Sequence, residues 1–241
     1  MISRKTSQTI RKAHRYLGVF LGLQFMAWTL SGLYFSWTDI DEIHGDHFRK
    51  IPPSQVHFED LVAPVLPGID GINRLEFRAI AGHPFYWIND SLLLDAHTGA
   101  VRQGITAAEA IAVAENHMQS NLKVLDVARI TSAGSHHEYR GKPLPAYVLS
   151  YAGTQDLKVY VSERDGKFQT VRYNSWRWFD FLWMTHTMDY EGRDDFNTLL
   201  LRIFSLMGLI TVLSGFLLWG VSSPRLRKMI QKLKNKDHED L

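Results

Sequence analysis

Histidines are the side chains of this chain best suited to bind a metal or move a proton. The sequence has 11 of them and no cysteine. The lack of cysteine excludes disulfides, thiolate metal sites and cysteine nucleophiles. His186 lies in the densest aromatic stretch, WRWFDFLWMTHTMDY, over residues 176–190. An imidazole there can ligate a haem iron, ligate another metal or donate a hydrogen bond that caps a helix.

The spacing of this aromatic stretch predicts a helix. Trp176, Phe179, Trp183 and His186 follow one another at intervals of three or four residues, so they would share one helical face. A helix lying in the lipid headgroup layer explains the tryptophans. It explains His186 less well, so a ligand role for His186 stays open beside the purely interfacial one.

Three further histidines are candidate ligands. His14 precedes the first apolar run, and His44 and His47 follow it in the acidic segment TDIDEIHGDHFRK. Two histidines three residues apart on a helix can share a ligand, but the glycine between them weakens the helix. A solvated acidic turn is therefore the alternative for His44 and His47.

Two uncharged apolar runs predict membrane-spanning helices. They cover residues 16–37 (YLGVFLGLQFMAWTLSGLYFSW) and 203–221 (IFSLMGLITVLSGFLLWGV), and about 20 residues suffice to cross a bilayer. A secretory signal peptide is the rival interpretation of the first run, because bases precede it. The run is longer than a signal h-region and ends in Tyr34, Phe35 and Trp37, which favours a membrane anchor.

Small residues recur in both runs. Each contains the triplet Leu-Ser-Gly, at residues 30–32 and 213–215. Gly18 and Gly22 form a GxxxG pair, and Thr211 and Gly215 have the same spacing. Such residues let membrane helices pack closely, so the sequence is compatible with an intramolecular helix pair or with a homodimer.

The charge distribution predicts the orientation in the membrane. The first fifteen residues hold five bases and no acid, and the segment after residue 221 is also basic. Residues 38–202 hold 16 bases and 22 acids. Because cytoplasmic flanks are rich in Lys and Arg, we expect both termini in the cytoplasm and the central region outside. The overall charge of +2 and the lack of a nucleic-acid motif indicate no nucleic-acid partner.

The central region shows one order of elements twice. A helical pattern over residues 57–66 precedes predicted strands at 72–80, 84–89 and 92–95. In the second copy, Thr106 and Glu109 form a capping box that opens a helix to about Met118. Predicted strands follow at 124–130, 146–151, 157–162 and 168–173. The repetition suggests a duplication.

These residues carry a resemblance to a known family. TAAEAIAVAEN over 106–116, LPAYV over 144–148 and VYV followed by DGK near 159–167 resemble a PepSY domain, and GHPFY with LDAHTG over 82–99 resembles a shorter copy. HRYLG at 14–18, the stretch around His186 and LSGFLLW at 213–219 resemble PepSY-associated transmembrane proteins. The likeness covers roughly residues 10–222, although larger members commonly have four spans.

The resemblance implies a function. Some PepSY-associated transmembrane proteins resemble ferric-siderophore reductases that bind b-type haem through histidine. It therefore implies haem b at His186, completed by His44 or His47. His14 lies about a bilayer away from His186, so His14 either belongs to a second site or is only an interfacial cation beside Arg15. Met184, Met188, Trp183 and Arg177 would supply the surroundings of the first site. The alternative is a non-enzymatic, membrane-anchored binding module for a peptide, a protease or an envelope protein.

We therefore expect an α+β membrane protein of the bacterial inner membrane, with two transmembrane helices flanking a periplasmic domain of two tandem PepSY-like units. Its expected partners are the bilayer, a ferric siderophore, and a second copy or another membrane subunit. The expected segments are a cytoplasmic basic arm (1–15), a first span (16–37), a linker (38–55), a short unit (56–104), a second unit (105–175), an aromatic interfacial segment (176–198), a second span (199–221) and a cytoplasmic basic tail (222–241).

Overall fold

The computed structural model describes residues 4–50, 57–65, 71–153 and 155–224. It divides into two compact units. The first, here called the helical unit, comprises the described residues up to Ser36 and from Leu182 onward; the second, here called the domain, is Trp37–Phe181. The predicted basic tail beyond residue 224 and the Pro52–Pro53 part of the linker lie outside the described residues.

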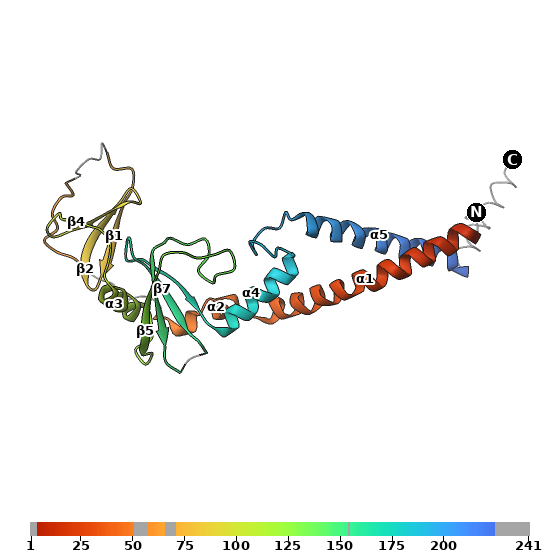
Figure 1. Cartoon of the computed structure of the whole chain (residues 1–241), viewed down its shortest axis with the longest axis horizontal. Coiled ribbons are helices and arrows are strands. Elements are labelled where there is room, and N and C mark those ends of the chain that lie inside the picture. The colour runs from red at the N-terminus through yellow and green to blue at the C-terminus, as the bar shows by residue number, and fades with distance from the viewer. Residues whose placement is uncertain (1–3, 51–56, 66–70, 154, 225–241) are drawn as a thin grey trace, which may run out of the picture. The chain divides into compact units, whose positions relative to one another are not determined.

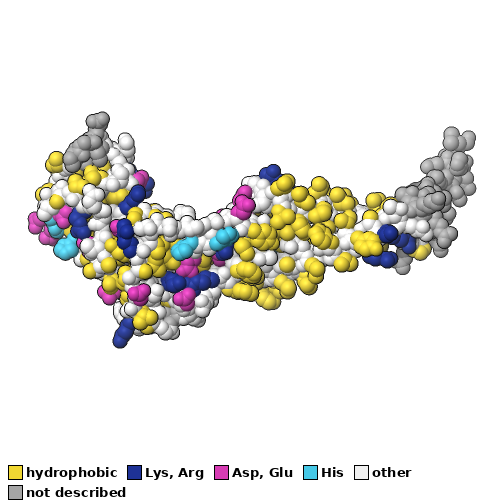
Figure 2. All heavy atoms as spheres, in the orientation of Figure 1, with side chains coloured by type: hydrophobic (Ala, Val, Ile, Leu, Met, Phe, Trp, Pro, Cys, Tyr) yellow, Lys and Arg dark blue, Asp and Glu magenta, His cyan; other side chains and the backbone are white. Residues whose placement is uncertain are grey.

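Two long helices, α1 (Arg4–Trp37) and α5 (Leu199–Ser222), form most of the helical unit. Both are long and apolar enough to cross a membrane, over Gln8–Trp37 and Leu199–Gly220. Their side chains stay largely exposed, and Figure 2 shows apolar atoms covering the surface of this unit, with basic side chains gathered at one end. An apolar surface of this kind matches a hydrocarbon environment.

α1 begins before the predicted first span, whereas α5 begins at the first residue of the predicted segment 199–221. α1 starts at Arg4, so the basic residues up to Arg15 belong to the helix. α5 starts at Leu199, and its N-cap is Thr198, whose hydroxyl accepts a hydrogen bond from the Leu201 amide at 3.2 Å. The acidic residues Asp194 and Asp195 upstream therefore do not cap this helix, because a closer hydroxyl satisfies its first turn.

α1 and α5 run side by side (Figure 1) in opposite directions. The Arg11 guanidinium donates to the Ser222 hydroxyl at 3.3 Å, and the rings of Phe20 and Phe204 stack with centroids 5.6 Å apart. A Cβ placed on Gly208 would lie 3.0 Å from the Phe25 ring, so this glycine lets the ring approach α5. The start of the first span and the end of the second therefore lie at the same end of the pair.

The domain holds two four-stranded antiparallel sheets. The first has the order β1-β2-β3-β4 and the second the order β5-β6-β7-β8. The strands are β1 (Leu75–Ile80), β2 (His83–Ile88), β3 (Leu92–Asp95), β4 (Val101–Arg102), β5 (Val124–Ile130), β6 (Ala146–Tyr151), β7 (Lys158–Ser162) and β8 (Phe168–Arg172). The short α2 (Ile40–Ile43) and the 3-10 helix η1 (Asp46–Phe48) precede them.

The helix α3 (Ala107–His117) begins as the sequence predicted. The Thr106 hydroxyl accepts from the Glu109 amide, and the Glu109 carboxylate accepts from the Thr106 amide at 2.7 Å, which completes the capping box. α3 buries Ala110, Val113 and Ala114 in a core that also contains Trp87 of the first sheet and Leu149 of the second. The two sheets (Figure 1) therefore share one core.

The helix predicted over residues 57–66 was wrong for the described residues 57–65, which contain no helix. Instead, the Val62 amide donates to Ala96 O at 2.9 Å, and the Tyr86 hydroxyl donates to Val62 O at 3.0 Å. Pro64 also disfavours helical geometry at the residue before it. The order of one helix and four strands thus occurs at α3 and β5–β8, and the tandem arrangement of two PepSY units stays a prediction.

Candidate functional site

His186 lies in the helical unit, near the end of α4 (Asn174–Thr187), a helix that contributes residues to both units. Its Nδ1 is 2.7 Å from the hydroxyl of Ser31, a buried residue of α1. Its backbone carbonyl accepts from the Trp28 indole nitrogen at 2.8 Å. Because the last carbonyls of a helix have no partner within the helix, Trp28 caps α4 and fixes the position of His186.

Aromatic rings surround the His186 imidazole. Phe35 meets it edge-on at 5.6 Å between centroids, and the Trp28 ring lies at 6.4 Å. Trp183 contacts Phe35 at 5.7 Å and Phe196 at 5.5 Å, both edge-on. The histidine thus stands in an apolar environment with one polar contact to its ring, the Ser31 hydroxyl.

His14 has the same kind of contact at a different place in the helical unit. Its Nδ1 is 2.7 Å from the hydroxyl of Ser214 on α5. A Cβ placed on the neighbouring Gly215 would lie 3.3 Å from Cε1 and 3.9 Å from Nε2 of the imidazole. The glycine therefore leaves room beside the ring edge that carries Nε2.

The two histidines do not form one site. His14 and Ser31 are 17 residues apart on α1, which corresponds to about 25 Å along the helix axis. No hydrogen-bond partner of either Nε2 atom lies among the residues that the structure describes. The helical unit thus presents two separate imidazoles, each with one ring nitrogen engaged by a serine.

His44 and His47 lie in the domain and are exposed. His44 is the C-cap of α2, and its amide donates to Ile40 O at 2.9 Å. The ring of His47 lies against Phe48 and Tyr173, with centroids 3.9 and 5.4 Å away. Gly45 between the two histidines has φ +82°, so they do not share a regular helix. In the described part of the chain, no group of three His, Asp or Glu side chains is placed to hold a metal ion.

Arg177, predicted to lie near a cofactor at His186, belongs to the domain and is engaged there. Its guanidinium donates to Glu138 at 2.6 Å and forms an ion pair with Asp156 at 3.0 Å. Glu138 also accepts from the Tyr160 hydroxyl at 2.5 Å. The sequence analysis missed this cluster, because nothing in the loop around Glu138 indicates which helix it meets.

The cluster shifts the ionisation of its members. Burial raises the pKa of Glu138, but the hydrogen bonds from Arg177 and Tyr160 outweigh it, so the pKa lies below its usual range. Burial lowers the pKa of Arg172 to about 10, and this guanidinium lies 3.9 Å from the centroid of the Trp176 ring. Arg140 forms a further ion pair with Asp180 at 2.6 Å. These charges join the loop before β6 to α4.

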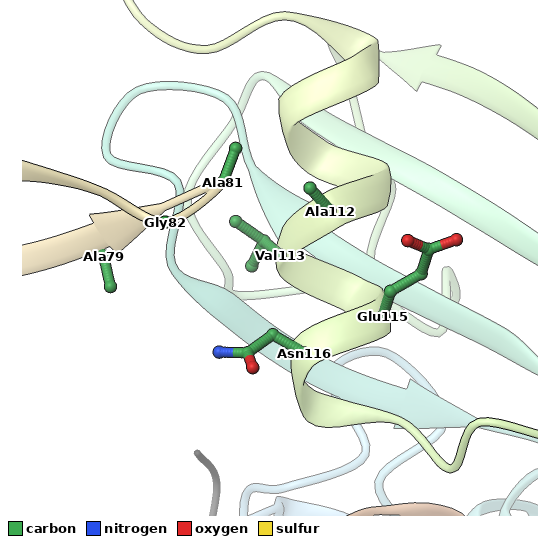
Figure 3. Close-up of a pocket in the computed structure, with 7 residues that line it drawn as sticks. All are labelled: Ala79, Ala81, Gly82, Ala112, Val113, Glu115 and Asn116. Atoms are coloured by element: carbon green, nitrogen blue, oxygen red, sulfur yellow. The ribbon is translucent and has the colours of Figure 1, made fainter. Parts of the chain in front are cut away.

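A hollow of about 350 Å³ lies between the β1–β2 hairpin and α3 (Figure 3). Small side chains of the hairpin and of the helix line most of it, and Glu115 and Asn116 are its polar groups. It lies within the domain and contains no histidine. Its lining suits a short apolar segment better than a metal or a charged cofactor.

The sequence of this chain matches one known protein family. The family model described as the PepSY-associated TM region matches residues 11–237. The chain has no match among curated proteins or among solved structures. The matched region includes most of α1, the domain, α4 and α5, with all four candidate histidines. The protein is a membrane protein, and it belongs to the PepSY-associated transmembrane family.

Proposed function

We propose that this chain is a haem-binding electron-transfer protein that passes electrons across a bacterial inner membrane to an acceptor outside. The observation that carries the proposal is the pair of imidazoles in the helical unit, His14 and His186. His14 lies in the first span, and His186 packs against it. The Nδ1 atom of each imidazole is within hydrogen-bond distance of a serine hydroxyl. Ionisable residues buried at membrane depth are expensive and are usually functional.

The residues present fit a b-type haem. An axial haem ligand is typically an imidazole nitrogen in an apolar slot, and metal-bound histidines almost always donate their other ring N–H to a neighbouring acceptor. His186 has Ser31 as that neighbour and aromatic walls from Phe35 and Trp28. His14 has Ser214, and Gly215 leaves space at its ring edge. A bound haem would supply one-electron transfer at each place.

A haem at either place would need a further ligand. His44 and His47 stay the predicted ligands within the chain, and a second copy of the chain or another membrane subunit would supply a ligand at His14. Because Arg177 is held by Glu138 and Asp156, it is a weaker candidate for a haem propionate than its place in the sequence suggested.

The orientation follows from charge. Basic residues before the first span, among them Arg11, lie at the end of the helix pair where α5 ends at Ser222, and the sequence after the second span is also basic. The positive-inside rule assigns that end to the cytoplasm and the acidic domain to the periplasm. Family resemblance suggests a ferric siderophore as the electron acceptor, which would make the chain a reductase or a redox subunit in iron uptake.

An absorbance spectrum of detergent-purified protein, air-oxidised and then reduced with dithionite, tests the proposal. We expect a Soret band, sharp reduced bands and stoichiometric haem in the pyridine adduct. His186→Ala and His14→Ala should each remove one population of haem, and the His44→Ala and His47→Ala variants would identify the second ligand. His136→Ala, in an exposed loop, is the matched control. A colourless protein from haem-replete cells would refute the proposal.

One observation favours the binding module as a second candidate function. β1 is an edge strand of its sheet that exposes Leu75 and Phe77, and its Ala79 lines the hollow at α3. Exposed strand edges accept an extended peptide as an additional strand. A peptide selected from a random library for binding to the unaltered chain provides the test. Loss of binding in Phe77→Lys, with an unchanged absorbance spectrum, would support this function.

A further inference from the structure

The Leu-Ser-Gly triplets of the two spans have a common role in the fold. The serine of the first triplet, Ser31, contacts His186, and the serine of the second, Ser214, contacts His14. The glycine that follows each serine lies beside the same imidazole. A Cβ on Gly32 would be 3.8 Å from Cε1 of His186, and one on Gly215 would be 3.3 Å from Cε1 of His14. The repeated motif therefore builds the same contact twice.

Each Leu-Ser-Gly triplet contacts a histidine from another helix. α1 supplies His14 to the triplet of α5, whereas the triplet of α1 receives His186 from the segment that leads into α5. Because α1 and α5 run in opposite directions, the two triplets lie toward opposite ends of the pair. This is the pattern of an inverted repeat, which membrane proteins use to build related sites on the two sides of a bilayer.

The serine hydroxyls determine which nitrogen of each imidazole carries the proton. The Ser31 oxygen is 2.7 Å from Ala27 O, and the Ser214 oxygen is 2.7 Å from Thr211 O. A carbonyl oxygen only accepts hydrogen bonds, so each hydroxyl must donate its single hydrogen to the helix backbone. The same oxygen then accepts from the imidazole. In that arrangement the hydrogen of the neutral imidazole would lie on Nδ1, and the lone pair of Nε2 would be left free.

We propose that the Leu-Ser-Gly triplet is a duplicated imidazole-positioning element. In it, Ser31 and Ser214 hold His186 and His14 as Nδ1–H tautomers and present Nε2 to a metal centre. The tautomer follows from the serine contacts alone, and the metal part rests on the proposed haem function. Ser31 and Ser214 are positioning residues in this account, because they act through the imidazoles.

The first test needs no cofactor. Solid-state ¹⁵N NMR of haem-free, full-length protein in bilayers, labelled at histidine and kept above the usual histidine pKa of about 6.5, separates protonated from bare ring nitrogens. Difference spectra against His14→Ala and His186→Ala assign the two residues. We expect both to be Nδ1–H tautomers. An Nε2–H tautomer at either residue in the unaltered chain would overturn the proposal.

The chain contains references for both tautomers. His117 Nδ1 is 2.8 Å from Val113 O, so it must be protonated. His137 Nδ1 accepts from the Tyr139 amide at 3.0 Å, so its neutral form is protonated at Nε2. Signals of these two residues, assigned with their alanine variants, calibrate the measurement inside the same sample.

Serine variants complete the test. Ser31→Ala should change the His186 signals and leave those of His14 unchanged, and Ser214→Ala should do the reverse. Ser31→Thr keeps a hydroxyl, so the His186 signals should stay as in the unaltered chain. Ser36→Ala is the matched control, because Ser36 donates to Leu33 O at 2.8 Å in the same way and has no histidine partner among the described residues. Unchanged His186 signals in Ser31→Ala would refute the positioning role.

Haem-loaded protein gives an independent measure. Loss of a hydrogen bond behind a metal-bound histidine typically weakens metal binding about 10- to 100-fold. Loss of this hydrogen bond also makes the imidazole donate less electron density to the iron, which favours the reduced state. Ser31→Ala should therefore raise the midpoint potential of the haem at His186 only. If the tautomers are as expected but no haem binds, the haem function fails while the positioning role stands. If haem binds with the same affinity and potential in Ser31→Ala, the positioning role fails.

Discussion

The two units of this protein use polar side chains in opposite ways. In the domain, buried charges neutralise one another: Glu138 pairs with Arg177, Arg140 with Asp180, and Arg78 with Asp165. In the helical unit, two half-buried contacts join serine hydroxyls to imidazoles, and each imidazole keeps one nitrogen free of partners among the described residues.

This difference distinguishes polar groups that folding requires from polar groups that it does not require. A charge buried away from water needs a partner to be tolerated, so the pairs of the domain are explained by folding alone. The serine–histidine contacts leave binding capacity unused, which folding does not require. On the proposed function, ligand chemistry therefore belongs to the helical unit, and the charges of the domain support its fold.

The strongest test of this assignment is Glu138→Ala. It leaves Arg177 without its closest partner in a largely buried place, so we expect a loss of about 3 kcal/mol in the free energy of unfolding, measured by denaturant titration of the domain signal. Asp156→Ala removes an exposed partner of the same arginine and should cost less than about 1 kcal/mol. Equal losses in the two variants would contradict the assignment.

The helix pair offers a second comparison. Gly208→Val should strain the contact with the Phe25 ring, which a Cβ would meet at 3.0 Å, and destabilise the pair by about 1–3 kcal/mol. Gly22→Val is the matched control, because nothing lies within 4 Å of a Cβ at Gly22. Thermal unfolding in detergent, followed by helical circular dichroism, measures both. A larger effect at Gly22 would indicate that the GxxxG pair packs against a second chain.

Acid should affect the domain through Glu138. Because its pKa is lower in the folded protein than its usual value of 4.5, the paired carboxylate contributes stability that is fully present above about pH 4.5 and is lost as the pH falls through the folded pKa. Glu138→Gln should flatten this part of the profile of unfolding free energy against pH. An unchanged slope in that variant would show that other carboxylates dominate.

The smallest effect is expected at the ring edge of His14. Gly215→Ala would place a methyl group 3.3 Å from Cε1 of the imidazole, so we expect little change in stability and weaker haem binding at the His14 site alone. Gly22→Ala is the control. Haem titration followed by absorbance distinguishes the two, and equal affinities would show that the space beside His14 is not used.

Much of the fold could be predicted from local patterns. The length of the apolar runs indicated both spans, the Thr106–Glu109 pair located the start of α3, and turn residues between short runs located the strands. The helix expected over residues 57–66 failed, because hydrogen bonds of Val62 with the first sheet override a short helical pattern.

The residues of the candidate site could be predicted from the sequence, but the contacts between them could not. The sequence by itself determined that histidines near the spans could act as ligands and that a Leu-Ser-Gly triplet occurs in each span. Only the tertiary structure decided that Ser31 meets His186 and that Ser214 meets His14, which are 155 and 200 residues apart along the chain. Helix periodicity fixes which residues share a face, but which helix that face meets depends on packing between distant segments.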